Sequence, residues 1–308
     1  MTGRTPKLGL LVMAYGTPKD RGDVEAYYTD IRRGNPPPPH LLEELMSRYD
    51  AIGGTFPLRA ITQAQVAALT RALADRGADA VVALGQKHAD PRVEDGVREL
   101  LAGGVDAIVG LVLAPHYSGF SIKQYADRAA AVASEAGVPV TTIDSWHLLP
   151  AYLDFLQLAV ADALAQVPDG SHVVFTAHSL PEKILIGGDP YPSQLQATAE
   201  AVAARLGLTN WSVGWQSAGR TADTWLGPDI LEVVRAKKAG GQPGLVACAC
   251  GFVADHLEVR FDLDVDAARV ADEVGLPFAR TRSLNDDAVV MAALAGVVLD
   301  EGARLLAR

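Results

Sequence analysis

Short apolar runs alternate with helix-length amphipathic stretches along almost the whole chain, and this alternation is the feature that most restricts the fold. A strand–helix repeat of this kind predicts a mostly parallel sheet with helices on both faces. The predicted strands are Leu8–Met13, Ala80–Leu84, Ala107–Leu113, Val138–Ile143, His172–Ala177, Trp211–Gln216, Gly244–Cys250 and Pro277–Ala279. The predicted helices are Thr62–Arg76, Pro91–Leu101, Ile122–Ala136, Pro150–Gln166, Tyr191–Leu206, Pro228–Lys238, His256–Val274 and Leu284–Ala307.

The order of these elements divides the chain into two halves of four strands each. The first half extends over about residues 1–147 and the second over about 148–308. The strand that leads into Ala14-Tyr15-Gly16 has the same pattern as the one that leads into Ala177-His178-Ser179. Because no low-complexity linker separates the halves, we expect one α/β unit of 308 residues with an internal structural repeat.

Composition excludes several classes of protein. Hydrophobic residues make up 49% of the chain, as in globular proteins, and the net charge of -10 disfavours nucleic-acid binding. No apolar run reaches the roughly 20 residues that span a bilayer. We read the apolar start as a buried strand and not as a signal peptide. Cys248 and Cys250 are the only cysteines, so we expect a protein of the reducing cytoplasm without a disulfide framework.

Polar and titratable residues follow five of the predicted strands. They are Tyr15, Lys87-His88, His116, His178 and, shortly after the seventh strand, Asp255-His256. Ligands of open parallel sheets bind beyond the carboxyl ends of the strands. Any one of these residues alone is more typical of a structural role, but their joint position indicates a functional rim.

His178 is the most informative single residue of this rim, since it ends a buried strand and precedes Ser-Leu-Pro-Glu-Lys. A hydrogen-bonded structural histidine is the alternative interpretation. Ser179 also raises the possibility of a serine nucleophile. The chain has no G-x-S-x-G sequence at a strand-to-helix turn, which a serine hydrolase would need to expose that side chain.

An acidic row is the second candidate site. Glu258, Asp262 and Asp266 recur every four residues and therefore lie along one side of a predicted helix. A solvated acidic face near a helix start is the alternative. Only Arg269, three residues after Asp266, is spaced on this helix to pair with one of the three. Such oxygen ligands suit a route for a divalent cation.

Several motifs, in order along nearly the whole chain, resemble those of ferrochelatases, and most closely the coproporphyrin ferrochelatases of Gram-positive type. The matching stretches are GLLVMAYGTP, YYTDIRRG, SRYDAIGG, LAPHYSGFS, AHSLPEK, GDPYP, VGWQSAGRT, WLGPD and GFVADHLEV. The resemblance implies a chelatase fold, with two Rossmann-like halves and a porphyrin cleft between them. It also implies a lyase of haem biosynthesis that inserts Fe(II) into coproporphyrin III to give coproheme.

The resemblance also implies roles for single residues. His178 matches the family's metal-binding and proton-accepting histidine, and Glu258 matches its carboxylate partner. Asp262 and Asp266 match an acidic row proposed to feed metal to the site, on a helix that is locally widened. Tyr15 matches a tyrosine that faces the opposite side of the macrocycle and can ligate product iron. This residue favours coproporphyrin over protoporphyrin.

Four further residues match positions that contact the porphyrin and its propionates, namely Arg32, Arg48, Tyr49 and Tyr125. Arginine suits this role because its guanidinium pairs bidentately with carboxylates. The family often has a serine where this chain has Phe56, and Thr55 could supply the hydroxyl instead.

No cofactor beyond the substrate Fe(II) is expected, because two cysteines cannot supply the four ligands of the [2Fe-2S] cluster found in some relatives. We expect a monomer without an integral membrane segment, with transient partners from the haem pathway. The alternatives are a protoporphyrin IX ferrochelatase, a chelatase for another metal such as cobalt, a non-catalytic haem-binding or haem-delivery protein, and a periplasmic-type metal-binding protein.

Overall fold

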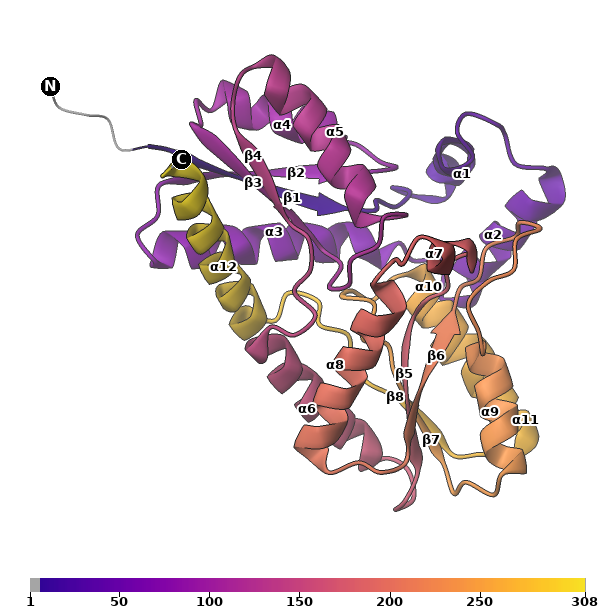
Figure 1. Ribbon diagram of the computed structural model, residues 1–308. Helices are drawn as coiled ribbons and strands as arrows, with labels where there is room; N and C mark the ends of the chain where they lie inside the picture. Colours follow the sequence, from indigo (N-terminus) through magenta and orange to yellow (C-terminus); the bar gives the residue numbers. More distant parts are fainter. Residues whose placement is uncertain (1–5, 308) are drawn as a thin grey trace, which may run out of the picture. The chain divides into compact units, whose positions relative to one another are not determined.

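The computed structural model describes residues 6–307, whose strands form two four-stranded parallel sheets (Figure 1). This architecture confirms the predicted α/β fold class. The first sheet contains β1 (Leu8–Ala14), β2 (Ala80–Gln86), β3 (Ala107–Val112) and β4 (Val140–Ile143). The second contains β5 (His172–His178), β6 (Trp211–Gln216), β7 (Leu245–Cys248) and β8 (Phe278–Arg280).

Helices fill the connections between the strands. Those before β5 are the short 3₁₀ turn η1 (Arg21–Asp23), α1 (Val24–Ile31), α2 (Pro39–Ala51), α3 (Pro57–Asp75), α4 (Val93–Ala102), α5 (Ile122–Glu135) and α6 (Pro150–Leu164). Those after it are α7 (Lys183–Ile186), α8 (Tyr191–Leu206), α9 (Ile230–Ala239), α10 (Leu257–Val259), the π-helix η2 (Arg260–Ala267), α11 (Ala268–Val274) and α12 (Ala288–Leu306). The sequence patterns gave no separate prediction for α1, α2 or α7.

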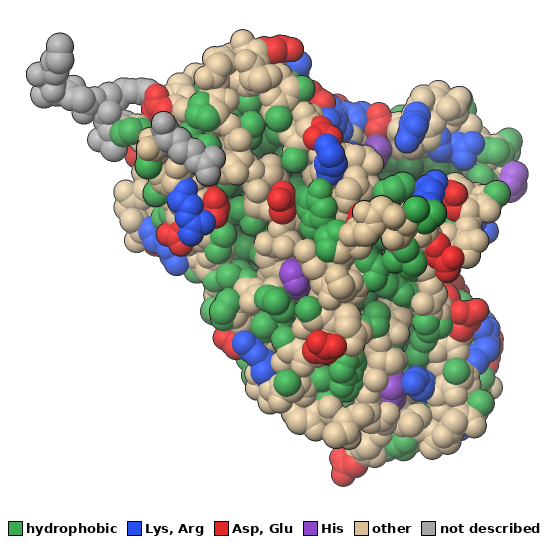
Figure 2. Space-filling model, in the orientation of Figure 1, with side chains coloured by type: hydrophobic (Ala, Val, Ile, Leu, Met, Phe, Trp, Pro, Cys, Tyr) green, Lys and Arg blue, Asp and Glu red, His purple; other side chains and the backbone are tan. Residues whose placement is uncertain are grey.

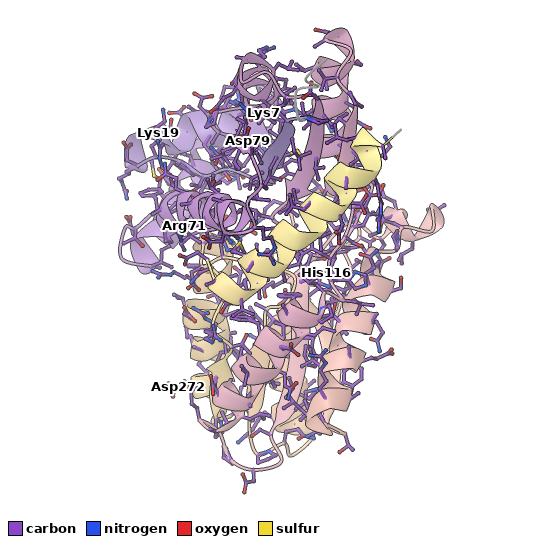
Figure 3. The ribbon with its side chains drawn as sticks, turned by 90° about the vertical axis from the view of Figure 1, so that its left-hand side faces the viewer. Lys7, Lys19, Arg71, Asp79, His116 and Asp272 are labelled. Carbon is purple, nitrogen blue, oxygen red and sulfur yellow. The ribbon has the colours of Figure 1, made fainter. Side chains whose placement is uncertain are left out.

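The first sheet has the strand order β2-β1-β3-β4, with β1 and β3 buried along their whole length. Helices α4 and α5 pack on one face, where Leu11, Val97 and Ile122 belong to one apolar cluster. Helix α12 crosses the strands on the other face (Figure 3). Both faces of the sheet are therefore covered, which explains why β1 is a continuous apolar run without alternation.

The second sheet has the equivalent order β6-β5-β7-β8. Helices α6 and α8 pack on one face, and α9, α11 and η2 lie on the other. Val174, Val234 and Leu263 belong to the apolar cluster of that second face. The central strand β5 is buried up to Ala177 and emerges only at its last residue, His178.

The chain divides into two compact units whose membership differs from the predicted halves. The first unit comprises residues 1–43, 58–146 and 285–308, and the second comprises 44–57 and 147–284. The predicted division at about residue 147 matches only the middle boundary. Helix α12 lies in the first unit because its apolar side packs on β3 and β4, and Gly302 lets it approach Leu8 closely. Residues 44–57 include the second part of α2 and belong to the second unit.

On the face drawn in Figure 2, acidic and basic side chains both occur over most of the surface, and several Lys and Arg side chains lie over the region of α1 and α2. None of the helices within residues 6–307 combines the length and the apolar character needed to cross a membrane.

Candidate functional site

His178 lies at the point where β5 leaves the core of the second unit. The adjacent Gly251 is required by packing, because a Cβ there would lie 2.3 Å from the Cβ of Ala177. Tyr191 donates a hydrogen bond from its hydroxyl to the His178 carbonyl oxygen at 3.1 Å. Close strand packing on one side and a buried tyrosine on the other therefore fix the backbone of His178.

The two ring nitrogens of His178 face different partners. Nδ1 lies 2.5 Å from the Ser179 carbonyl oxygen, which can only accept, so Nδ1 carries a proton. In the neutral ring this leaves the lone pair on Nε2, which lies 3.7 Å from Oε1 of Glu258. A backbone carbonyl thus selects the tautomer in which Nε2 can accept a proton or bind a metal.

Glu258, the second residue of α10, lies between two imidazoles. His256 Nε2 is 3.6 Å from its Oε2, on the side away from His178. Desolvation favours the neutral carboxyl, but the two histidines outweigh it and hold the pKa of Glu258 well below its usual range. Desolvation likewise opposes charge on His178, yet Glu258 and the Ser179 carbonyl together raise the pKa of His178. The pair therefore favours a carboxylate beside an imidazole that binds a proton readily.

The acidic row continues into the π-helix η2, which confirms the locally widened helix implied by the resemblance. Asp262 is buried on this helix, with its Oδ2 accepting a hydrogen bond from the Ser217 hydroxyl. Its Oδ1 lies 4.0 Å from Nη1 of Arg48. Burial raises the pKa of Asp262 to about 6, although Ser217 and Arg48 oppose the shift. Asp262 is therefore a carboxylate whose charge changes near neutral pH.

Asp266 is the outermost member of the row. Its Oδ1 lies 3.4 Å from Nη2 of Arg269, the ion-pair partner that sequence spacing anticipated. Arg269 also pairs with Glu273 at 2.6 Å, so its charge is shared between two carboxylates. The row is thus one carboxylate between two histidines, one buried carboxylate and one at the surface.

Arg48, Tyr49 and Thr55 lie on or just after the end of α2, in the same unit as His178. The Arg48 guanidinium lies over the Phe261 ring at 4.9 Å and pairs with Glu44 at 3.2 Å. Tyr49 is buried and stacks on Phe56 at 4.4 Å, so the residue in the place of the family's serine packs on a predicted substrate contact. The Thr55 hydroxyl donates to the Ile52 carbonyl oxygen at 3.3 Å.

Tyr15 follows β1 in the first unit, and 44% of its surface is exposed. Its ring lies 4.7 Å from that of His88. The ammonium of Lys87 lies 5.9 Å from the Tyr15 ring and 5.6 Å from the ring of buried Tyr125. Burial, together with nearby arginines, lowers the pKa of Lys87. The end of the first sheet therefore combines two phenols with a partly desolvated ammonium group.

The side chain of His88 contacts an aspartate of α1, which in turn binds an arginine of the loop that precedes α4. Its Nδ1 lies 2.7 Å from Oδ2 of Asp30, which also accepts a hydrogen bond from Arg92 at 3.0 Å. Arg32, by contrast, lies apart from this group. Its Nε donates to the Asn35 carbonyl oxygen at 3.3 Å, and its guanidinium lies 5.9 Å from the Tyr28 ring.

Three residues that contact the site in the structure received no individual role from the sequence, although Lys87 and His256 were placed in the predicted functional rim. His256 shares Glu258 with His178, Ser217 holds Asp262, and Lys87 lies over Tyr15. His256 and Lys87 stand at strand ends, which was a usable signal. Ser217 adopts a left-handed φ of 61° just after β6. It lies within the matching stretch VGWQSAGRT, but nothing in that stretch distinguishes it as a contact of Asp262.

Comparisons with known proteins identify the family of the chain. The family model described as Ferrochelatase matches residues 7–301. A coproporphyrin III ferrochelatase from Geobacillus sp. (strain WCH70) is 45% identical over 301 residues, covering 95% of this chain and 97% of the relative. A protein of the same name from Halalkalibacterium halodurans is 43% identical over 298 residues, covering 95% and 96%.

Solved structures with the same fold include the sirohydrochlorin chelatase SirB from Bacillus subtilis subspecies spizizenii in complex with cobalt. It is 12% identical, with a TM-score of 0.61 over 98% of each chain, and this likeness concerns the fold alone. The family model spans nearly the whole chain, and relatives above 40% identity cover both units. The chain belongs to the ferrochelatase family.

Proposed function

We propose that this chain inserts Fe(II) into coproporphyrin III, giving coproheme and releasing two protons. The observation that carries the proposal is the His178–Glu258 pair, in which a backbone carbonyl fixes the tautomer and leaves Nε2 as the proton acceptor. The names of the most similar relatives support the choice of substrate. The reaction is a metal-for-proton exchange: Fe(II) enters the ring as two pyrrole N–H bonds break.

His178 Nε2 accepts a pyrrole proton and becomes an imidazolium, and Glu258 stabilises the new charge at 3.7 Å. The proton then passes to solvent, since 33% of the His178 side chain is exposed. The neutral ring restored in this way accepts the second pyrrole proton. The ring must deform for its nitrogens to reach the metal, so binding a distorted porphyrin would favour the transition state over the flat substrate.

Fe(II) is proposed to arrive along Asp266 and Asp262 before it meets Glu258 and His178. Carboxylate oxygens and a neutral imidazole are suitable ligands for this ion. The Ser217 hydroxyl holds one oxygen of Asp262 and leaves its second oxygen toward Arg48. A carboxylate with a pKa of about 6 can also release the metal when it takes up a proton.

Coproporphyrin has four propionates and protoporphyrin has two, so the proposed cationic contacts, Arg32 and Arg48, distinguish the substrates. Each charge-assisted pair contributes on the order of 1.5–3 kcal/mol, less where it is exposed. We therefore expect kcat/KM to be at least about ten-fold higher for coproporphyrin III than for protoporphyrin IX.

An anaerobic assay of both porphyrins with Fe(II) and with Co(II), under one detergent condition, tests this proposal. Equal or better kcat/KM with protoporphyrin IX would place the enzyme in the protoporphyrin branch. Tyr15 is proposed as an axial ligand of product iron, so Tyr15→Phe should shift the visible spectrum of bound coproheme. An unchanged spectrum would remove that role.

The same proposal includes a cytoplasmic monomer without an iron–sulfur cluster, which meets haem-pathway partners transiently. Two cysteines supply half the ligands of a [2Fe-2S] centre. Both thiols are buried, and burial raises the pKa of Cys250 well above its usual value. Thiols in this state are poor metal ligands.

A further inference from the structure

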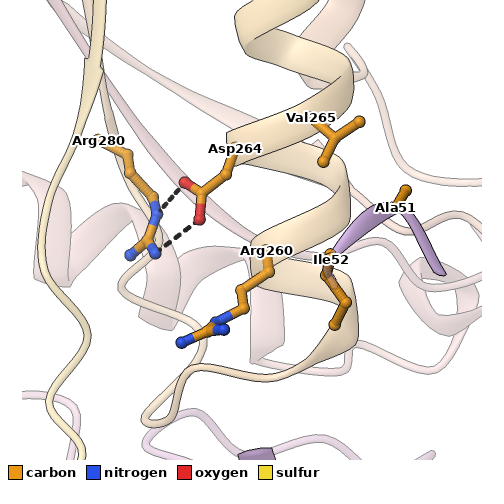
Figure 4. Close-up of a pocket in the computed structure, with 6 residues that line it drawn as sticks. All are labelled: Ala51, Ile52, Arg260, Asp264, Val265 and Arg280. Carbon is orange, nitrogen blue, oxygen red and sulfur yellow. Dashed lines mark hydrogen bonds and ion pairs between the residues drawn. The ribbon is translucent and has the colours of Figure 1, made fainter. Parts of the chain in front are cut away.

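A pocket in the second unit lies on the side of the π-helix away from the acidic row. Its volume is about 370 Å³. The lining residues are Ala51, Ile52, Arg260, Asp264, Val265 and Arg280 (Figure 4). Positions two apart on a helix face opposite ways, so Arg260 and Asp264 point away from Asp262. The contacts agree, since Asp262 meets Ser217 and Arg48 while Asp264 meets Arg280.

Arg280 lines one side of this pocket, and hydrogen bonds hold its guanidinium in place. Its guanidinium makes two bonds to Asp264, at 2.5 and 2.9 Å, and one to Asp255 at 3.1 Å. A fourth bond, at 3.0 Å, goes to the Thr281 carbonyl oxygen. Arginine has five N–H donors, so one N–H on Nη1 remains for a ligand.

Arg260 is the second arginine that lines the pocket. It is half-buried, and its guanidinium makes no hydrogen bond or ion pair with any side chain or carbonyl within residues 6–307. In Figure 4 it extends from the helix toward the side on which Arg280 lies. A guanidinium in a pocket without a carboxylate partner retains the full planar fork that recognises an oxyanion.

The other lining residues and the charges of the pocket restrict the kinds of ligand that it can bind. Ile52 and Val265 provide apolar surface for a short hydrocarbon chain. Two arginines and one aspartate line the pocket, and Asp255 behind Arg280 balances the remaining charge, so the unpaired cation is Arg260. Repulsion from Asp264 and Asp255 grows with the charge of the ligand, so one carboxylate suits this single guanidinium better than a dianion does.

We propose that this pocket binds the carboxylate of a small monoanion on a short aliphatic chain, with the carboxylate on Arg260 and the spare N–H of Arg280. Two sources share this chemistry: a free short-chain organic acid, and a propionate arm of the porphyrin. Only the second source rests on the proposed function.

Methyl NMR of the full chain, titrated with butyrate, reads the site through Ile52 and Val265. The chemical shifts of the methyl groups of both residues should change saturably with butyrate. Arg260→Gln should raise the Kd for butyrate at least about ten-fold, the effect of losing one charge-assisted pair. Arg260→Lys, which keeps the charge and loses the fork, should be intermediate. Arg235→Gln is the matched control and should bind as wild type, because this exposed arginine on α9 bonds only the Leu231 carbonyl oxygen within the described part of the chain.

Neutral butanol tests whether the ligand must carry a carboxylate, and inorganic phosphate tests whether it must carry a short aliphatic chain. It is overturned if butanol shifts the methyl groups as butyrate does, if phosphate binds more tightly than butyrate, or if Arg260→Gln has the wild-type Kd. Adding metal-free coproporphyrin III separates the sources: a raised apparent Kd for butyrate identifies the propionate arm, and an unchanged Kd identifies a free acid. The titration involves neither iron nor turnover, so it fails or succeeds independently of the proposed chelatase activity.

Discussion

The two sheets have the same strand order and the same two-sided covering by helices, but their carboxyl ends carry opposite chemistry. The first ends in the phenol of Tyr15, beside Lys87 and His88. The second ends in His178, which leads to Glu258 and Asp262. A repeated frame can thus present an aromatic, cationic edge suited to an anionic macrocycle and an imidazole–carboxylate edge suited to a metal ion. Substitutions at each edge should therefore have separable effects.

The largest expected effect is at the imidazole. His178→Ala removes the proposed base and should lower kcat by about 10²–10⁴-fold, while porphyrin affinity, measured by fluorescence quenching, is largely kept. Glu258→Gln should behave similarly because it keeps the shape and removes the charge. His40→Ala, an exposed histidine on α2, is the control. Turnover of His178→Ala above a tenth of wild type would end the assignment of the base to the second sheet.

The acidic row should affect metal supply more than chemistry. Asp262→Asn together with Asp266→Asn should raise the KM for Fe(II) about ten-fold, the effect of roughly 1.4 kcal/mol of lost binding, and leave the KM for porphyrin nearly unchanged. Asp272→Asn, an exposed position on α11 labelled in Figure 3, is the matched control. The reverse pattern, with only the porphyrin KM altered, would make the row a solvated face.

The pH dependence should separate the two edges further. In the proposed metal route Asp262 acts as a carboxylate, and its pKa is raised to about 6, so kcat/KM for Fe(II) should fall as pH drops through about 6. His178 must be neutral to accept a proton, and its raised pKa also costs activity on the acid side. In Asp262→Asn, the fall of kcat/KM near pH 6 that Asp262 causes should disappear, and only the fall caused by protonation of His178 should remain. An identical profile would show that Asp262 does not titrate during turnover.

The raised pKa of Asp262 also makes the stability of the folded state depend on pH. The folded state binds a proton at Asp262 more tightly than the unfolded chain, so this stabilisation is complete below about pH 4 and is lost as pH rises through about 6. Asp262→Asn should therefore raise the melting temperature at pH 7 and have little effect at pH 4. A lower melting temperature at pH 7 would show that Ser217 and Arg48 outweigh the cost of burial.

The smallest expected effect lies at the cysteines, which belong to neither edge. Cys248→Ser and Cys250→Ser should keep kcat within about two-fold per folded molecule, because both thiols are buried in the core around β7. Absorbance of the purified wild type in the visible range is the second measurement. A charge-transfer spectrum lost on either substitution would overturn the proposal of a cluster-free chain.

The sequence sufficed for the strands because buried parallel strands are unbroken apolar runs, as in β1 and β5. Edge strand β4 begins two residues later than predicted, because the Val138 N–H still bonds back to the Ala133 carbonyl oxygen at the end of α5. Edge strand β8 has the predicted length but is shifted by one residue, to Phe278–Arg280. Which sheet α12 covers could not be read from its own pattern, because an apolar helix face does not specify its partner. Likewise Ser217 and Arg48 reach Asp262 from distant segments, and spacing along one helix cannot reveal such neighbours.

The placement of α12 has a consequence for synthesis on the ribosome. Strands β1 to β4 are complete by residue 143, but the helix that covers β3 and β4 is translated only after residue 287, when the second sheet already exists. During that interval the nascent chain exposes an apolar sheet face, which is a site for chaperone binding and for aggregation. A chain cut at residue 147 should therefore be retained by a chaperone, whereas one that has the segment 285–308 supplied in trans should be released from it.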